Sequence, residues 1–323
     1  MPTEQQIGIH CKTLSGDSLT QTNLCPSVKR LLQEDLRLPI EQCVAAYIGR
    51  PWHIKQTKDK TDAASHPAAI LSDGAYRVFA KLGEGDLAED QFTQELAGLR
   101  LLTERAGVLT PTGIGIVPVE NGALFIMAAV EVVAQGPAHW QQMGQTLAQL
   151  HQVKGEQFGL DHHCYWGSLY QDNRPLPDWP TFYWTRRIEP RLREAVNAGR
   201  LPPVLVTQME KLGNRLDKLC GPPVQPALLH GDAHQNNFLS TAQGPVLIDP
   251  SAYYGHPEVE LAYVDFFAPV AADFYLGYQA VTPIAPDFAE RRALWLIPAW
   301  LAMLDLPGHL DELKTALQHY IYD

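Results

Sequence analysis

Three residues in the second half of the chain have the types and the spacing that phosphoryl transfer requires. Asp232 ends a His-Gly-Asp tripeptide, Asn237 follows five residues later, and Asp249 ends a short apolar run at 246–248. A loop carboxylate can accept the proton of an attacking hydroxyl, while an amide and a second carboxylate can hold Mg²⁺ against nucleotide phosphates. The pattern therefore predicts Asp232 as the catalytic base, and Asn237 and Asp249 as ligands of Mg²⁺.

Each member of this triad also has an ordinary structural interpretation when it is taken alone. Asp232 could be a solvated turn residue, and Asn237 could cap a turn through its side chain. Asn236 stands beside Asn237, but the five-residue offset from the base favours Asn237. We expect His230 to brace the loop, and we expect His234 to form hydrogen bonds or to line the acceptor site.

A lysine and a glutamate upstream of the triad could position the nucleotide phosphates. Lys81 stands in a strand-like run, and Glu95 follows fourteen residues later in a run with helical spacing. Kinases use a strand lysine to contact the α- and β-phosphates and a helix glutamate to hold that lysine. Each residue alone would more often be a surface charge, but their order along the chain favours a functional ion pair.

The last strand-like run before residue 130 is where an adenine ring would bind. Main-chain groups at the end of such a strand can bond the ring edge, so Met127, Ala128 and Val130 are candidate nucleotide-binding residues. The alternative interpretation is a plain core strand. A glycine-rich phosphate loop is expected before the strand lysine, yet residues 51–73 contain no glycine. The small residues of 61–67 would have to cradle the phosphates instead.

The elements that must carry these residues change character near residue 130. Before it, short strand-like runs flank one helical run, whereas most later runs have helical spacing. We expect strands at 52–57, 68–71, 76–82, 114–119 and 123–130, and helices at 26–48 (broken at Pro39), 92–102, 140–151, 181–198, 204–219 and 293–306. The pattern predicts an α+β, bilobal protein-kinase-like fold. Residues 1–130 would form a nucleotide-binding lobe that begins with a polar arm at 1–25, and residues 131–323 would form the lobe with the catalytic loop and the acceptor site.

Composition and charge narrow the possible partners and the compartment. The 323-residue chain has a formal net charge of −11 and no long Lys/Arg-rich run, which argues against nucleic-acid or anionic-membrane partners. It has neither a signal-peptide pattern at its N-terminus nor an apolar run of the ~18 residues that a membrane helix needs. Five scattered cysteines without metal-binding spacing suit a reducing cytosol, so we expect a cytoplasmic protein.

The chain resembles the fructosamine kinase (ketosamine kinase) family, within the aminoglycoside-phosphotransferase-like kinases. The resemblance runs from about residue 27 to the end and rests on the His-Gly-Asp loop, on the segment 248–258 with its Tyr-Gly-His sequence, and on residues 158–190. It implies ATP and Mg²⁺ as cofactors and a sugar hydroxyl of a sugar–amine adduct as acceptor. The chain departs from the family pattern at Ala233, His234 and Asn236, where Leu, Trp and Gly are usual, and at Glu260, where Asp is usual.

Two other functions stay open at this point. The same chemistry could serve another acceptor, such as an aminoglycoside or an amino alcohol, because the residues around Asp232 depart from the family pattern. A pseudokinase that binds nucleotide weakly and serves as an interaction module is the other alternative, since the phosphate loop is irregular. Against it stands the retention of all five predicted polar site residues.

Overall fold

The computed structural model describes residues 25–61 and 66–322, and the predicted arm at 1–25 therefore lies almost wholly outside the described residues. The N-terminal part is built on one antiparallel five-stranded sheet with the order β1-β2-β3-β5-β4. Its strands are β1 (Gln56–Asp59), β2 (Ala68–Ser72), β3 (Arg77–Glu84), β4 (Gly113–Val119) and β5 (Gly122–Ala128). The order places β3, which carries the predicted lysine, in the centre of the sheet.

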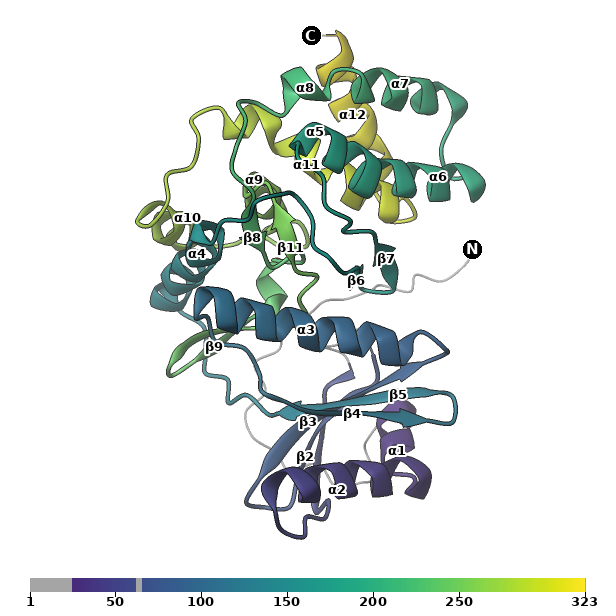
Figure 1. Ribbon diagram of the computed structural model, residues 1–323, viewed down its shortest axis with the longest axis vertical. Helices are drawn as coiled ribbons and strands as arrows, with labels where there is room; N and C mark the ends of the chain where they lie inside the picture. The colour runs from purple at the N-terminus through teal and green to yellow at the C-terminus, as the bar shows by residue number, and fades with distance from the viewer. Residues whose placement is uncertain (1–24, 62–65, 323) are drawn as a thin grey trace.

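Helices cover both faces of this sheet (Figure 1). Helices α1 (Pro26–Leu31) and α2 (Glu34–Ile48) pack on one face, around a buried cluster that includes Ile40 and Trp52. Helix α3 (Ala88–Ala106) packs on the other face through Phe92 and Leu99. The far end of α3 belongs to a different cluster, because Leu102 packs among residues of the C-terminal part. Helix α3 is therefore shared by both parts of the molecule.

The C-terminal part is mostly helical, with short two-stranded sheets among the helices. Its elements are α4 (Pro137–Gln152), β6 (Cys164–Trp166), β7 (Leu169–Gln171), α5 (Trp179–Phe182), the π-helix η3 (Tyr183–Ile188), α6 (Glu189–Asn197), α7 (Pro203–Gly213), α8 (Leu216–Leu219), β8 (Ala227–Leu229), the 3-10 turn η4 (Gln235–Asn237), β9 (Phe238–Thr241), β10 (Gly244–Leu247), β11 (Tyr253–Gly255), α9 (Glu258–Tyr263), α10 (Ala272–Gln279), α11 (Phe288–Ala302) and α12 (His309–Tyr322). Two large buried clusters form its core. The predicted α+β architecture is confirmed.

Several predicted element boundaries were wrong. Pro39 does not break the N-terminal helix: it lies inside α2, and the interruption falls at Leu32 and Gln33 instead. The helix continues because Leu36, Ile40 and two further buried side chains hold it against the sheet, which outweighs the hydrogen bond that proline removes. The strand expected at 52–57 starts only at Gln56, because Trp52 is buried as a packing residue.

Two predicted helices in the C-terminal part are interrupted. The stretch at 181–198 contains the wider turn of a π-helix, Tyr183–Ile188, between α5 and α6. The stretch at 204–219 divides into α7 and α8 at Asn214 and Arg215. Hydrophobic periodicity does not distinguish a π-turn from an α-turn over six residues, so the sequence did not indicate the first of these changes.

Polar contacts connect the two parts beside α3. The Asp90 carboxylate near the start of α3 accepts hydrogen bonds from His163 Nε2 at 2.7 Å and from the Tyr165 hydroxyl at 2.6 Å. Beyond the end of α3, the Leu247 N–H donates to the Leu109 carbonyl at 2.9 Å. The parts thus meet through polar contacts near both ends of α3 and through the packing of Leu102.

Candidate active site

The predicted catalytic loop follows β8 and depends on a glycine. Gly231 has φ +85°, a conformation that side-chain-bearing residues rarely adopt. A Cβ at this position would also collide with the backbone carbonyl of Ser251. Ser251 N–H in turn donates to the His230 carbonyl at 2.8 Å. The loop therefore lies directly against the segment that leaves Asp249.

Asp232 is held from two sides. Trp166 Nε1, from β6, donates to Asp232 Oδ1 at 2.7 Å. Asn237 Nδ2 donates to Asp232 Oδ2 at 3.1 Å and to the Asp232 carbonyl at 2.8 Å. Burial raises the pKa of Asp232 to about 8, and nearby Asp249 adds to the effect, whereas the Trp166 hydrogen bond opposes it. The carboxylate is thus fixed in orientation and poorly solvated, as a base that orients a hydroxyl should be.

His230 and Glu260 support the loop from behind. His230 Nε2 lies 2.9 Å from the Ile248 carbonyl and its Nδ1 accepts from Asp232 N–H at 3.2 Å, so the ring braces two backbone segments. Glu260 accepts from the N–H groups of His230 at 3.1 Å and Gly231 at 2.6 Å. Its Oε2 also lies 3.0 Å from Nε2 of His151 in α4. The buried Glu260 carboxylate therefore anchors the backbone of the catalytic loop.

The departure from the family pattern at His234 is explained by local packing. It begins the 3-10 turn η4, where its ring accepts from Asn236 N–H at 3.3 Å. The ring packs edge-on against Phe267, with centroids 5.0 Å apart. Burial lowers the pKa of His234 to about 4, which leaves the ring neutral at physiological pH. This histidine therefore shapes the wall beside Asp232 without adding charge there.

Lys81 contacts its predicted partner Glu95 and also Asp249, which was predicted as a metal ligand. Its Nζ lies 2.6 Å from Glu95 Oε2 and 2.8 Å from Asp249 Oδ1, so one buried ammonium bridges α3 and the C-terminal part. Burial opposes the charge, but the two carboxylates outweigh it and raise the pKa of Lys81 above its ordinary value. Asp249 has φ +52°, the single positive value among the non-glycine residues that the structure describes. Such backbone strain is found most often at functional sites.

The donor set suits a magnesium ion that is shared with a nucleotide. Among residues 25–61 and 66–322 there is no group of three or more His, Cys, Asp or Glu side chains that could hold a metal by itself. Mg²⁺ typically takes one or two protein oxygens and completes its octahedron with phosphate and water. Asn237 commits its amide nitrogen to Asp232, so its amide oxygen could serve as one ligand and the Asp249 carboxylate as another. The residues present therefore fit such an ion.

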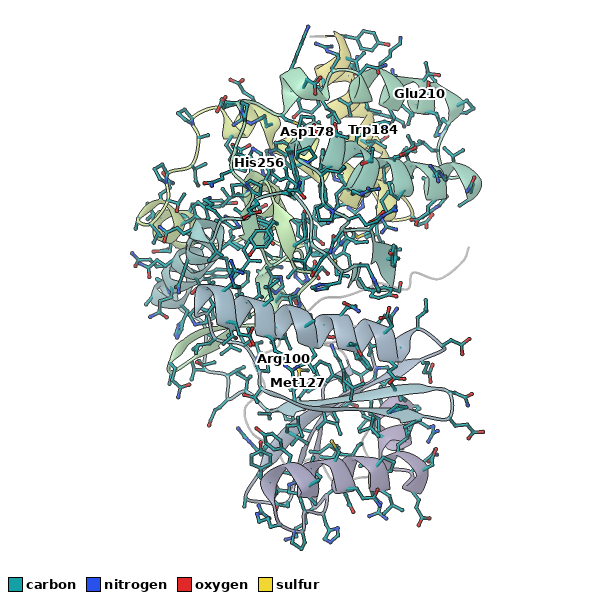
Figure 2. The ribbon with its side chains drawn as sticks, in the orientation of Figure 1. Arg100, Met127, Asp178, Trp184, Glu210 and His256 are labelled. Atoms are coloured by element: carbon teal, nitrogen blue, oxygen red, sulfur yellow. The ribbon has the colours of Figure 1, made fainter. Side chains whose placement is uncertain are left out.

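The predicted adenine-binding strand end is only partly available. Met127, labelled in Figure 2, packs under α3 in a buried cluster with Phe92, and its side chain is core. Ala128 N–H donates to the Thr112 carbonyl at 2.9 Å, so it is not free to bind a ring. Val130, just beyond β5, stays the candidate donor. The predicted phosphate stretch at 61–67 connects β1 to β2, and its residues 62–65 lie outside the described residues.

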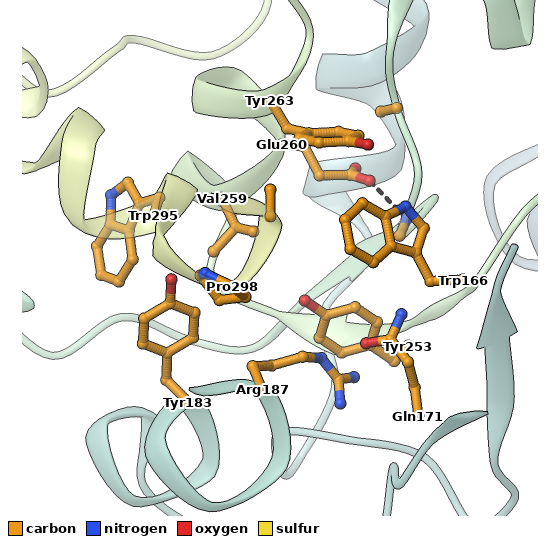
Figure 3. A pocket seen from close by; sticks show the side chains of 13 residues that line it. Trp166, Gln171, Tyr183, Arg187, Tyr253, Val259, Glu260, Tyr263, Trp295 and Pro298 are labelled. Carbon is orange, nitrogen blue, oxygen red and sulfur yellow. Dashed lines mark hydrogen bonds between the residues drawn. The ribbon is translucent and has the colours of Figure 1, made fainter. Parts of the chain in front are cut away.

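A pocket opens beside the catalytic loop (Figure 3). Five aromatic side chains line it, and Gly231 and Ala233 of the loop line it too. The lining residues are Trp166, Gln171, Tyr183, Arg187, Gly231, Ala233, Tyr253, Val259, Glu260, Tyr263, Trp295, Pro298 and Ala299. Trp166 both lines this pocket and donates a hydrogen bond to Asp232. If the hydroxyl of an acceptor molecule lay at Asp232, the rest of that molecule would therefore occupy this pocket.

Sequence reasoning missed three residues of this site. Trp166, Glu260 and Arg187 come from segments that carry no recognised spacing relative to Asp232. Glu260 stood out only as a mild departure, although it holds two loop N–H groups. The one available signal was the aromatic-rich composition of residues 158–190, which gives no contact partners.

Comparison with known proteins agrees with this geometry. Residues 38–321 match the family model described as fructosamine kinase. The chain is 31% identical over 258 residues to a protein from Vibrio parahaemolyticus described as a probable ketoamine kinase, covering 78% of this chain and 88% of that protein. A fructosamine-3-kinase candidate from Thermobifida fusca has a TM-score of 0.74 at 29% identity, covering 87% of this chain and 96% of that chain.

A more distant likeness shows the shared fold. A thermostable mutant of an aminoglycoside phosphotransferase, solved with AMP-PNP and hygromycin B, superposes with a TM-score of 0.58 at 15% identity. The match covers 87% of this chain and 96% of that chain. The predicted similarity to aminoglycoside phosphotransferases is thereby confirmed at the level of architecture.

Proposed function

The chain belongs to the fructosamine kinase family, and we propose on this basis that it uses ATP to phosphorylate a sugar hydroxyl of a ketosamine at the site around Asp232. The observation that carries the proposal is the convergence of Lys81, Glu95 and Asp249 within ion-pair distance, next to a fixed loop carboxylate. Residues 1–130 would hold the nucleotide, and residues 131–323 would supply the catalytic loop and the acceptor pocket.

The chain's own residues would share the work as follows. Asp232 Oδ2 accepts the hydroxyl proton and orients the oxygen for in-line attack, while the Trp166 indole fixes Oδ1. Lys81 holds the α- and β-phosphates, and Glu95 retains the lysine when Asp249 turns to its metal role. Mg²⁺, bound by Asn237 and Asp249, would neutralise charge on the phosphates. No residue needs to become covalently modified.

The test is an ATP-consumption screen with matched acceptors. Fructosyl-, ribulosyl- and psicosyl-amines are compared with aminoglycosides and amino alcohols, and turnover is expected on the ketosamines. Activity on the second group alone would instead establish the alternative acceptor class. Absence of Mg²⁺-dependent ATP binding by calorimetry at millimolar nucleotide would favour a pseudokinase.

One substitution tests the base. We expect Asp232→Asn to reduce kcat by about 100-fold or more, because positioned bases contribute on this scale, while ATP binding persists. Asp161→Asn, the same change at an exposed aspartate paired with His162, is the control and should leave kcat unchanged. A near wild-type kcat for the Asp232 variant would show that the base lies elsewhere.

A further inference from the structure

One buried arginine in the acceptor pocket has no acidic partner. Arg187 is 6% exposed and donates to the Asp172 carbonyl at 3.0 Å, the Arg186 carbonyl at 3.1 Å and Asn173 Oδ1 at 2.6 Å. All three acceptors are neutral. Within the described ranges, no carboxylate lies within ion-pair distance of this guanidinium.

The other buried arginines are different. Arg191 pairs with Glu194 at 2.7 Å, and Arg291 pairs with Glu258 at 2.6 Å. A buried charge is costly unless an opposite charge or strong hydrogen bonds compensate it. This protein therefore supplies counterions to its structural arginines and leaves Arg187 without one.

Arg187 lines the pocket between aromatic side chains. Its guanidinium carbon lies 4.0 Å from the Tyr253 ring centroid and 4.9 Å from that of Phe182, so aromatic rings flank it. Arg187 Nε is buried and has no hydrogen-bond partner. Figure 3 shows the guanidinium beside the Gln171 amide within the pocket. Arg186 and Arg200 have an Nε in the same state but pair with carboxylates, so the feature that sets Arg187 apart is its lack of a counterion.

The local backbone is of the kind that often carries function. Arg187 and Tyr183 both lie on the π-helix η3 and both line the pocket. The π-turn is rare and is found frequently at functional sites. The Tyr183 hydroxyl donates a hydrogen bond to the Leu294 carbonyl at 2.9 Å, so we expect Tyr183 to contribute its ring to the pocket wall. The polar side chains that line the pocket near Tyr183 are therefore those of Arg187 and Gln171.

The acidic group nearest to this space is already compensated. Glu260 lines the same pocket, but its two oxygens accept from the backbone of His230 and Gly231 and contact the His151 ring. Asp232 is likewise bonded by Trp166 and Asn237. The pocket is thus lined by one positive charge without a counterion and by one carboxylate, Glu260, that is bonded to the loop backbone and to His151.

We propose that Arg187 and Gln171 form a subsite for a carboxylate of the acceptor, so that the preferred ketosamines are adducts of free amino acids. This inference rests on the proposed function. The pocket reaches from the catalytic loop to Arg187, and an acceptor with its hydroxyl at Asp232 directs its amino-acid end to the guanidinium. Arginine binds carboxylates through strong, directional hydrogen bonds, which gives the chain selectivity despite its net charge of −11.

The experiment compares two acceptors that differ in one group. N-Fructosylglycine carries a carboxylate, and N-fructosylglycinamide carries an amide of nearly the same size. For the wild-type protein we expect kcat/KM to favour the acid by about tenfold or more, mainly through KM, because a charge-assisted hydrogen bond replaces a neutral one. In Arg187→Met this acid-to-amide ratio should fall to near one.

Two further variants make the result specific. Gln171→Glu retains Arg187 and places a carboxylate beside it as an internal competitor, so it should also reduce the ratio even if the Arg187 variant fails to fold. Arg186→Met removes a neighbouring positive charge that pairs with Asp172 outside the pocket, and the ratio should stay at its wild-type value.

The outcomes separate this inference from the proposed function. Turnover of both acceptors by the wild-type protein without preference overturns the carboxylate subsite and leaves ketosamine phosphorylation intact. A ratio unchanged in both the Arg187 and Gln171 variants also overturns it. Turnover of neither acceptor, with aminoglycosides accepted, overturns the proposed function and this inference with it.

Discussion

Replacement of Glu260 by glutamine tests whether the buried, charged carboxylate of Glu260 anchors the catalytic loop. The wild-type carboxylate accepts from two loop N–H groups, at 2.6 and 3.1 Å, and contacts the His151 ring at 3.0 Å. Glu260→Gln keeps one acceptor oxygen and directs an NH₂ group toward a backbone N–H. One backbone N–H of the loop is then left buried without a hydrogen-bond partner. The other N–H donates to a neutral amide oxygen in place of a charged carboxylate.

The size of the effect follows from these contacts. An unsatisfied buried donor costs about 1–3 kcal/mol, and a hydrogen bond to a charged group contributes about 1.5–3 kcal/mol, more than a neutral one. We expect the free energy of unfolding to fall by about 3 kcal/mol. A shift of the loop by even an ångström can cost about 100-fold in rate, so kcat should fall on that scale. Glu260→Asp keeps the charge and should be less impaired in both respects.

Urea unfolding gives the stability change, and initial rates with saturating ATP give kcat. Glu104→Gln, the same chemical change at an exposed position of α3, is the control and should be silent in both assays. If Glu260→Gln unfolded within 0.5 kcal/mol of wild type, roughly the measurement error, and retained its kcat, the anchoring role would be refuted.

Three further predictions concern other parts of the site and the core. Lys81→Met leaves the half-buried carboxylates of Glu95 and Asp249 without their shared cation, so we expect a loss of about 3 kcal/mol or less in urea unfolding and a raised KM for ATP. Gly231→Ala places a Cβ against the Ser251 carbonyl at φ +85°, and a thermal-unfolding midpoint equal to wild type would contradict the reported collision. Burial lowers the pKa of His256 from 6.5 to about 4, and the unfolded chain therefore takes up a proton first as pH falls. The unfolding free energy should decrease between pH 6.5 and pH 4, by up to about 3 kcal/mol from this group, and His256→Asn should show a shallower decrease than wild type.

The polar residues with fixed spacing were the most predictable part of the site. Asp232, Asn237 and Asp249 could be selected from sequence because their intervals follow from one short loop and one strand. The structure brings Asn237 to Asp232 and brings Lys81 to Asp249. The fold class was equally accessible, because strand-like and helical periodicities occupy different parts of the chain. The roles assigned to these residues remain predictions.

The acceptor pocket could not be derived in the same way. Trp166 meets Asp232 only because the β6–β7 hairpin folds back over the catalytic loop, and Arg187 faces the pocket because a π-turn rotates it there. Neither relation leaves a spacing in the sequence. The departure at His234 drew attention to the acceptor side, but the aromatic residue that contacts Asp232 comes from another segment.

Helix α3 packs in two buried clusters, one on the sheet and one in the C-terminal part, so a tilt of the helix about one end would move residues near the other end. Its Leu102 end is fixed in the C-terminal cluster, and Glu95 lies seven residues away, which at 1.5 Å per residue is about 10 Å along the helix. A tilt of about 10° around the fixed end displaces Glu95 by roughly 2 Å, as simple geometry over that arm requires. That displacement is enough to separate Glu95 from Lys81, which lie 2.6 Å apart. The Glu95–Lys81 pair therefore depends on the position of α3 between its two buried clusters.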